Sequence, residues 1–293
     1  MYGDKVMTST SNFGVDDDRP MLSRRDVVTA GLTTGAVALT AAVISEAAAE
    51  ESTDSQKSLR NIKALTFDVF GTVVDWRSSV IREGQLLSER KGIDADWEAF
   101  ADAWRAGYGP AMNRVRTGDL PWMNINDLHR LILVDLLDEF GIHNLSSQEI
   151  DEFNRSWHRL LPWPDSVPGL NRLKSRFVLA TLSNGNVSLL TNMAKNAGLP
   201  WDCVLSAELS GHYKPDREVY ATAADLLDLP AENIMMVAAH KGDLRAAQSV
   251  GFKAGFVPRP LEYGPDIEVD TTPEAGFDVN ARDFLDLAAQ LGA

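Results

Sequence analysis

An apolar run at residues 62–67, which ends in the carboxylate of Asp68, constrains the fold of this 293-residue chain most strongly. A short run of this kind predicts a strand buried on both faces, and Gly71 and Thr72 then predict a turn. The carboxyl ends of buried parallel strands meet at the ligand crevice of an open α/β sheet. We therefore expect Asp68 to face a binding site. The alternative is a surface aspartate that merely ends the strand.

The remainder of the chain divides into a helical block and a region of alternating elements. Between residues 78 and 161, apolar residues recur at three- and four-residue spacing, which predicts helices. Beyond that block, we predict strands at 177–182, 203–207, 234–239, 254–257 and 277–279, and helices at 187–197, 217–227, 244–250 and 281–291. Such alternation predicts an α/β fold with a Rossmann-like, doubly wound parallel sheet. The core would comprise 62–77 and 162–293, with 78–161 inserted as a helical cap above the strand ends.

The composition limits the partners of the chain. Its 28 basic and 42 acidic residues give a net charge of −14, which disfavours nucleic acid and anionic membrane surfaces. The single cysteine, Cys203, excludes an intramolecular disulfide. One cysteine and five histidines show no closed zinc ligand set. An anionic ligand would therefore need a local basic pocket.

The N-terminal segment resembles an export signal of the twin-arginine type. Arg24 and Arg25 precede a weakly apolar stretch at 29–44, and three small residues follow at 47–49. We expect residues 1–49 to be the signal and residues 50–61 a linker, so that the mature protein is periplasmic and contacts no membrane. If the segment is not a working signal, the protein is cytoplasmic.

Polar residues cluster at the predicted strand ends. They are Asp68 and Thr72 after the first strand, Ser183-Asn184-Gly185 after the second, Tyr213-Lys214-Pro215-Asp216 before a helix, and His240-Lys241-Gly242-Asp243 after the strand at 234–239. A nucleophilic carboxylate, a hydroxyl with an amide, a lysine and a second carboxylate form a plausible site for covalent catalysis.

These four stretches, in this order and with an inserted helical cap, resemble the haloacid dehalogenase superfamily. Phosphatases of that superfamily carry an aspartate two residues after the nucleophile and an acidic Mg²⁺ ligand in the fourth stretch. Here these positions are Phe70 and Ala239. Phe70 cannot transfer a proton, and Ala239 has no side-chain oxygen for a metal ion. Both departures disfavour phosphoryl transfer, and we expect no metal ion and no cofactor.

The match is better with one branch, the type II 2-haloacid dehalogenases. FDVFGTVVDW at 67–76, AWR at 103–105, SNG at 183–185, YKPD at 213–216 and VY at 219–220 resemble that branch. The resemblance implies conversion of short 2-haloacids to 2-hydroxy acids and halide, through an ester on Asp68 and with inversion at the carbon. A halide leaves without a proton, so an aromatic side chain at Phe70 suits the reaction. Relatives of this type commonly form homodimers.

The resemblance also implies a role for each side chain. Asp68 is the nucleophile, Lys214 keeps it ionised, and Asp243 positions or deprotonates water. Arg105 and Asn184 stabilise the halide, and Ser183 binds the substrate carboxylate. Thr72 and Tyr220 support substrate binding. His240 stands where better-studied relatives carry Asn. It would order the water as a neutral imidazole or act as a base, and it would then produce a limb near neutrality in the pH–rate profile.

Two other functions remain open at this point. One is a different hydrolase reaction of the superfamily, such as phosphatase action, which would depend on added Mg²⁺. The other is an exported, non-catalytic protein that binds carboxylates in the same pocket, since a fold does not dictate a function.

Overall fold

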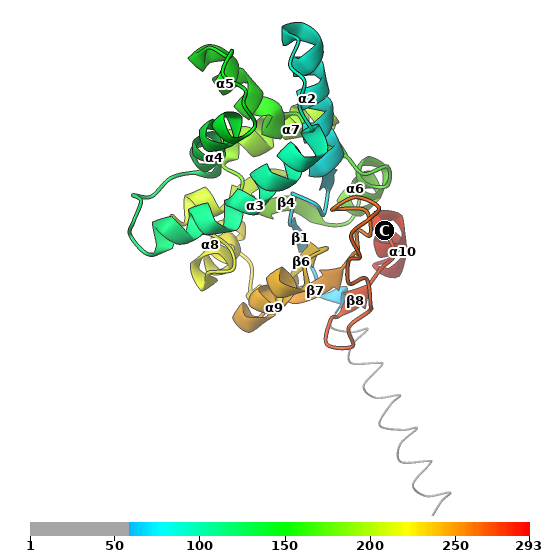
Figure 1. Ribbon diagram of the computed structural model, residues 1–293. Helices are drawn as coiled ribbons and strands as arrows, with labels where there is room; N and C mark the ends of the chain where they lie inside the picture. The colour runs from blue at the N-terminus through cyan, green and yellow to red at the C-terminus, as the bar shows by residue number, and fades with distance from the viewer. Residues whose placement is uncertain (1–58) are drawn as a thin grey trace, which may run out of the picture. The chain divides into compact units, whose positions relative to one another are not determined.

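The computed structural model describes residues 59–293 (Figure 1). The predicted export signal at 1–49 and most of the predicted linker at 50–61 lie outside the described residues. Within residues 59–293, no helix has both the length and the apolar character needed to cross a membrane.

The core is a six-stranded parallel sheet with the strand order β5-β4-β1-β6-β7-β8. Strand β1 (Ala64–Phe67) lies between β4 (Val178–Ser183) and β6 (Ile234–Ala238), and all four of its residues are buried. The outer strands are β5 (Cys203–Ser206), β7 (Lys253–Phe256) and β8 (Val279–Asn280). The predicted doubly wound parallel sheet is therefore confirmed. It places the end of β1, and thus Asp68, at the centre of the sheet edge.

Helices cover both faces of this sheet (Figure 1). On one face, α6 (Ser166–Lys174), α7 (Val187–Ala197) and α10 (Phe284–Gln290) pack in the same apolar cluster as Leu65 and Phe67 of β1. On the other face, α8 (Arg217–Leu227) and α9 (Lys241–Val250) pack in a second cluster with Ala64. The alternation of side chains along β1 explains this division, because successive residues of a strand point to opposite faces.

Four helices between β1 and α6 form the cap: α2 (Trp76–Lys91), α3 (Trp97–Arg116), α4 (Ile125–Glu139) and α5 (Ser147–Asn154). Figure 1 shows them beyond the ends of β1, β4 and β6. Side-chain oxygens of Asp75, Asp96, Asn124 and Ser146 accept backbone N–H groups at the four helix starts. Ser146 and Glu149 form a reciprocal capping box at the start of α5. Each helix start is therefore defined by a local hydrogen bond.

A short antiparallel ladder, which the sequence analysis missed, joins the two ends of the inserted segment. Strand β2 (Val74–Asp75) pairs with β3 (Leu161–Pro162). Each strand has two residues, and the run Pro162-Trp163-Pro164 reads as a break, so no periodicity indicates them. The carbonyl of Val73 accepts the N–H of Trp163 at 3.1 Å and the hydroxyl of Ser166 at 2.7 Å. The cap is thus attached directly to the turn that follows Asp68.

Two helices start at other residues than predicted. The last helix starts at Phe284, later than predicted, because the Asp283 carboxylate accepts the N–H of Asp286. Helix α9 starts at Lys241 and includes Asp243 in its first turn. That earlier start brings the Asp243 carboxylate to the sheet edge beside Asp68.

Candidate active site

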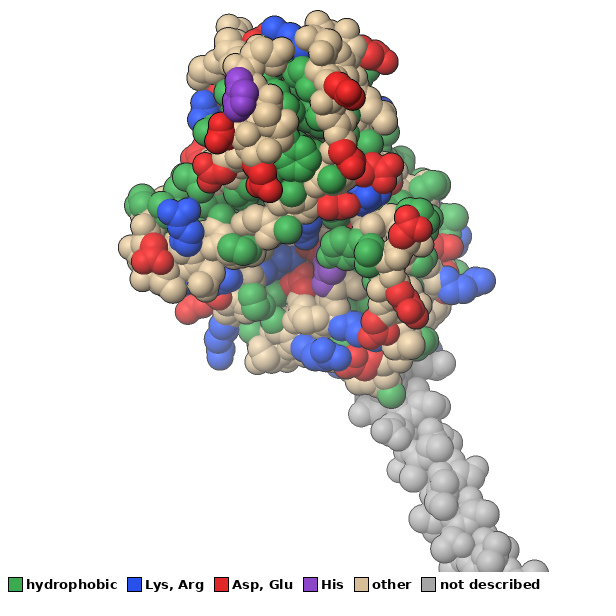
Figure 2. All heavy atoms as spheres, viewed as in Figure 1, with side chains coloured by type: hydrophobic (Ala, Val, Ile, Leu, Met, Phe, Trp, Pro, Cys, Tyr) green, Lys and Arg blue, Asp and Glu red, His purple; other side chains and the backbone are tan. Residues whose placement is uncertain are grey.

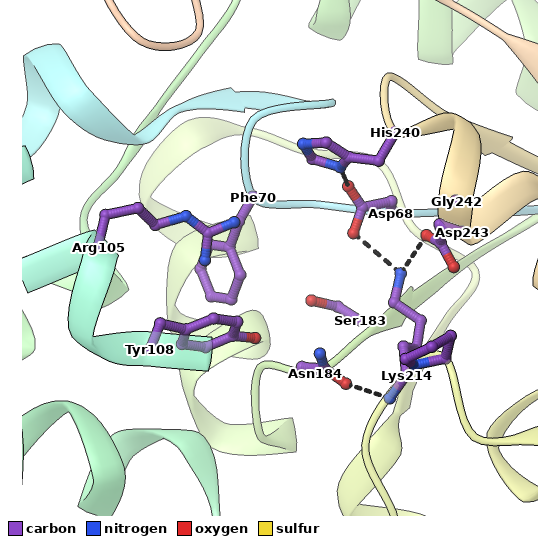
Figure 3. A pocket seen from close by; sticks show the side chains of 11 residues that line it. Asp68, Phe70, Arg105, Tyr108, Ser183, Asn184, Lys214, His240, Gly242 and Asp243 are labelled. Atoms are coloured by element: carbon purple, nitrogen blue, oxygen red, sulfur yellow. Dashed lines mark hydrogen bonds and ion pairs between the residues drawn. The ribbon is translucent and has the colours of Figure 1, made fainter. Parts of the chain in front are cut away.

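Asp68 lies at the centre of the site (Figure 3), and three side chains, two of which the figure draws, hydrogen-bond to its carboxylate. Lys214 Nζ is 2.9 Å from Oδ1, while Thr72 Oγ1 and His240 Nδ1 are 2.7 and 3.0 Å from Oδ2. The residue is 7% exposed. Burial opposes ionisation, but Lys214, His240 and Thr72 outweigh it and hold the pKa of Asp68 well below its usual range. Asp68 is therefore an ionised carboxylate whose orientation is fixed by hydrogen bonds.

Lys214 bridges the two carboxylates of the site. Its Nζ is 2.5 Å from Asp243 Oδ2, and its side chain is 8% exposed. Burial disfavours the ammonium charge, but Asp243 and Asp68 outweigh this effect and raise the pKa of Lys214. The backbone N–H of Lys214 donates to Asn184 Oδ1 at 2.7 Å, and Arg116 of the cap donates to the Lys214 carbonyl at 2.9 Å. The lysine therefore stays charged and is held by both core and cap.

Asp243 is the second carboxylate, and Tyr220 lies behind it. The Tyr220 hydroxyl is 2.5 Å from Asp243 Oδ1. Burial and the charge of Asp68 raise the pKa of Asp243, although Lys214 opposes this shift. Asp68 is therefore the more acidic carboxyl group of the pair, and Asp243 is better suited to exchange a proton.

A cavity of about 320 Å³ opens between the core and the cap beside these groups. Figure 2 shows a hollow between the two parts in which basic, acidic and histidine side chains gather. Its lining residues are Asp68, Phe70, Arg105, Tyr108, Ser183, Asn184, Lys214, Pro215, His240, Gly242 and Asp243. The space suits a small organic acid.

Two side chains of helix α3 face the cavity from the cap. The Arg105 guanidinium carbon lies 4.6 Å from the centre of the Tyr108 ring and 5.7 Å from that of Trp76. Arg105 Nη1 is buried and has no hydrogen-bond partner among the described residues. A buried guanidinium that is held by aromatic rings and keeps a free donor is suited to bind an anion.

The structure brings eight of the ten predicted site residues to the cavity wall and places the other two behind it. Thr72 and Tyr220 were predicted to bind substrate, but neither lines the cavity. Their hydroxyl groups instead contact the carboxylates of Asp68 and Asp243. The sequence analysis also missed Tyr108. It lies three residues after Arg105 on the same helix, and that spacing could have indicated it.

His240 differs most from its predicted role. Its Nδ1 contacts Asp68, and its Nε2 is 2.9 Å from Oε2 of Glu262, a residue that the sequence analysis did not select. Burial opposes protonation, but the two carboxylates outweigh it and raise the pKa of His240 to about 10. The ring is then an imidazolium at neutral pH. This contradicts the expected neutral imidazole, while the limb near neutrality in the pH–rate profile stays a prediction.

The site does not fit the Mg²⁺ ion on which phosphatases with this arrangement depend. Phe70 and Ala239 provide no oxygen ligand, and Mg²⁺ prefers several of them in octahedral geometry. The Lys214 ammonium lies between Asp68 and Asp243, 2.9 and 2.5 Å from their oxygens. The Lys214 ammonium therefore balances the charge of the two carboxylates, as Mg²⁺ does in those phosphatases.

Comparison with known proteins places the chain in a family. The model of the haloacid dehalogenase-like hydrolases matches residues 62–251. (S)-2-haloacid dehalogenase 4A of Burkholderia cepacia is 27% identical over 216 residues, which cover 69% of this chain and 87% of the relative. A solved L-2-haloacid dehalogenase is 48% identical, with a TM-score of 0.76 over 79% of this chain and 99% of the other. A defluorinating L-2-haloacid dehalogenase is 44% identical, with a TM-score of 0.77 over 79% and 96%. The chain therefore belongs to the haloacid dehalogenase-like hydrolases, and within them to the L-2-haloacid dehalogenase type.

Proposed function

We propose that this protein hydrolyses short 2-haloalkanoic acids to 2-hydroxy acids and halide. The observation that carries the proposal is the ionised Asp68, paired with Lys214 at 2.9 Å in a cavity where Phe70 replaces a general acid. A halide needs no proton to leave, so this arrangement suffices for carbon–halogen cleavage and not for cleavage of a phosphate ester. The solved relatives that are 48% and 44% identical are both L-2-haloacid dehalogenases.

In the first step, Asp68 Oδ1 attacks the carbon that bears the halogen, from the side opposite the leaving group. The C–O bond of an ester forms, the carbon–halogen bond breaks, and the carbon inverts. Arg105, with its free donor, and the side-chain amide of Asn184 would stabilise the departing halide, while Ser183 and nearby backbone N–H groups would bind the substrate carboxylate. Phe70 excludes water from the reacting carbon.

In the second step, water attacks Cγ of the Asp68 ester. Asp243 accepts one proton of that water, and the tetrahedral intermediate collapses with cleavage of the Cγ–Oδ1 bond. The alkoxide takes the proton from Asp243 and leaves as the 2-hydroxy acid. The second proton of the water is lost to solvent when the Asp68 carboxylate is regenerated. Substrate plus water thus give hydroxy acid, halide and one proton.

The proposed setting of the enzyme follows from the sequence. Export to the periplasm through the signal at 1–49 and assembly into a homodimer remain predictions. Both can be checked on the full-length protein, by fractionation of the cells that produce it and by light scattering of the purified product.

The proposal predicts an isotope pattern that no other route produces. With enzyme in excess in ¹⁸O-water, a single turnover of (S)-2-chloropropionate should label the Asp68 carboxylate and leave the product unlabelled, as read by peptide mass spectrometry. Direct attack of water on the substrate would label the product instead.

The steady-state assay is halide release from both 2-chloropropionate enantiomers and from fluoroacetate, with EDTA present. Asp68→Asn should lower the rate by about 10⁴-fold or more, because the nucleophile is lost. Absence of halide from every substrate would overturn the proposal. A requirement for Mg²⁺, with activity on phosphate esters, would support the phosphatase alternative, and carboxylate binding without turnover would support a binding protein.

A further inference from the structure

Glu262 is a buried carboxylate beyond the matched family region, and the reaction described above assigns it no role. It is 1% exposed, and its Oε1 and Oε2 lie 3.0 and 2.9 Å from His240 Nε2. Trp76 Nε1 donates to Oε1 at 3.3 Å. A buried charge is tolerated only when it is paired and hydrogen-bonded, and His240 is the cation that pairs with this one.

The backbone of the turn after Asp68 packs directly against the Glu262 carboxylate. Gly71 has a φ of +82°, and a Cβ atom there would lie 2.1 Å from Glu262 Oε1. The loop that carries Glu262 is tied to the same turn, because Arg259 Nε donates to the Thr72 carbonyl at 2.8 Å. Arg259 also forms a two-pronged ion pair with Asp165 at 2.7 and 2.9 Å. The position of Glu262 relative to Asp68 is therefore well defined.

Both ring nitrogens of His240 face carboxylates. Asp68 lies at Nδ1 and Glu262 at Nε2, and ionised carboxylates accept hydrogen bonds but do not donate them. Each nitrogen must therefore carry a proton, which makes the ring an imidazolium. Glu262 contacts Nε2, the ring nitrogen that faces away from Asp68, and thereby stabilises the doubly protonated ring.

Asp68 Oδ2 thus receives two oriented donors. The Thr72 hydroxyl accepts the N–H of Ala239 at 2.9 Å, so its own proton points to Oδ2 at 2.7 Å. His240 Nδ1–H points to the same oxygen at 3.0 Å. Oδ1 contacts only Lys214 among the described residues and is the oxygen that is free to attack.

We propose that Glu262 is a positioning residue that keeps His240 doubly protonated, so that His240 and Thr72 form an oxyanion hole at Asp68 Oδ2. This inference rests on the proposed function. In the ester, Oδ1 is bonded to the substrate carbon and Oδ2 is the carbonyl oxygen. When water adds to Cγ, the π-electron pair moves to Oδ2, where the two donors stabilise it. Collapse re-forms the C=O bond and breaks the Cγ–Oδ1 bond.

The need for Glu262 arises from the ester itself. In the free enzyme, the charge of Asp68 supports the imidazolium, but formation of the ester removes that charge. Glu262 is then the carboxylate that still contacts the ring. The other charged side chains around the cavity are Lys214 and Asp243 on the far side of Asp68, and Arg105 from the cap (Figure 3). Without Glu262, the ring would contact a neutral ester, and the rest of the cavity would hold two cations against the single carboxylate of Asp243, which favours loss of the imidazolium proton.

The first test separates the two chemical steps in Glu262→Gln, which keeps the shape of the side chain and removes its charge. Enzyme in excess is mixed rapidly with (S)-2-chloropropionate, and chloride, hydroxy acid and intact protein mass are followed. Hydrolysis should slow by about 10–100-fold, because the oxyanion hole loses its charged donor. Chloride release in the first turnover should change by less than about 3-fold, and the ester should accumulate. Glu152→Gln, at a cap side chain that is 63% exposed, is the matched control and should leave both steps unchanged.

The second test needs no turnover. The His240 ring is titrated by NMR in the wild type, in Asp68→Asn and in Glu262→Gln, with His240→Asn for assignment. The ring should stay protonated above about pH 8 in the first two proteins, and its pKa should be lower in the third, where Asp68 is the carboxylate that still supports the charge. If Glu262→Gln does not fold, the Asp68→Asn titration decides alone. An ordinary pKa there, or unchanged hydrolysis in Glu262→Gln, would overturn the role of Glu262. Failure to release halide would instead overturn the proposed function and leave this titration valid.

Discussion

The cavity has one wall from the α/β core and one from the helical cap, and the side chains of these two walls are held in different ways. In the core wall, Lys214 ties Asp68 to Asp243 by contacts of 2.9 and 2.5 Å. In the cap wall, Arg105 is held by the ring of Tyr108, and its buried Nη1 has no hydrogen-bond partner within residues 59–293. The core wall is complete in the free enzyme, whereas the cap wall keeps a donor for an incoming anion.

The difference indicates that the core wall is organised for the chemical steps and the cap wall for binding an anion. A buried donor without a partner costs free energy, and an anionic substrate or a halide that reaches it recovers that cost. Asp68, by contrast, already has donors on both oxygens, so that only a small rearrangement is needed before it attacks. Substitutions in the core wall should therefore act mainly on rate, and substitutions in the cap wall should act on anion binding as well as on rate.

The largest effect should come from removing the ammonium that joins the core wall. Lys214→Met leaves Asp68 next to Asp243 without the cation between them, so the pKa of Asp68 rises and its nucleophilicity falls. We expect a loss of about 10³-fold in kcat with a smaller change in KM, measured by chloride release.

Lys195→Met, at an exposed position of α7, is the control and should keep full activity. A rise in KM alone, with kcat preserved, would contradict the view that Lys214 acts on the chemical steps together with the rest of the core wall. Thermal unfolding of the variant shows whether the loss arises at the site.

A smaller effect, of a different kind, should follow from Arg105→Leu in the cap wall. The variant removes a charged donor from the anion site, which costs about 10–100-fold in kcat/KM, through KM where the substrate anion is bound and through kcat where the halide departs. Arg105→Lys should restore little, because an ammonium cannot stack on Tyr108 as a planar guanidinium does.

Arg114→Leu is the matched control, since this arginine lies on the same helix α3 and is exposed. It should leave both kinetic constants unchanged. If Arg105→Leu lowered kcat as strongly as Lys214→Met does, the two walls would share one role and the comparison would fail.

The sequence predicts the core wall well, because its residues follow apolar runs. Asp68, Ser183 and His240 each stand at the end of a buried run, and parallel strands bring such ends together. Local pattern therefore suffices to indicate both the fold and the convergence of these side chains. It does not show which groups face the cavity, and for that reason Thr72 and Tyr220 were assigned to the substrate instead of to the two carboxylates.

The contacts that the sequence could not indicate depend on packing between distant segments. Glu262 contacts Trp76, which is 186 residues away along the chain, and it lies in a loop without periodicity. The charge state of His240 follows from its own contacts with Glu262 and Asp68, so the expected neutral ring was wrong. The ladder of β2 and β3 has two residues in each strand, which is too short for any alternation to be recognised.

The smallest effect concerns stability and tests whether the core wall is assembled without substrate. The pKa of His240 is raised to about 10 in the folded protein and is about 6.5 in an unfolded chain. Its contribution to stability is therefore present in full below about pH 6.5 and is lost as the pH rises through about 10. The wild type should exceed His240→Asn in Tm by several degrees at about pH 6, and the difference should shrink toward about pH 10.5.

Arg105→Leu provides the contrast for this measurement. The Arg105 guanidinium has an unpaired buried donor, so its removal should cost no stability and should not change the pH dependence. Both variants are followed by thermal unfolding across the same buffers. If the Tm values of His240→Asn and the wild type differed by the same amount from about pH 6 to about pH 10.5, the carboxylates on either side of His240 would not hold its proton. The core wall would then be completed only by the substrate, as the cap wall is.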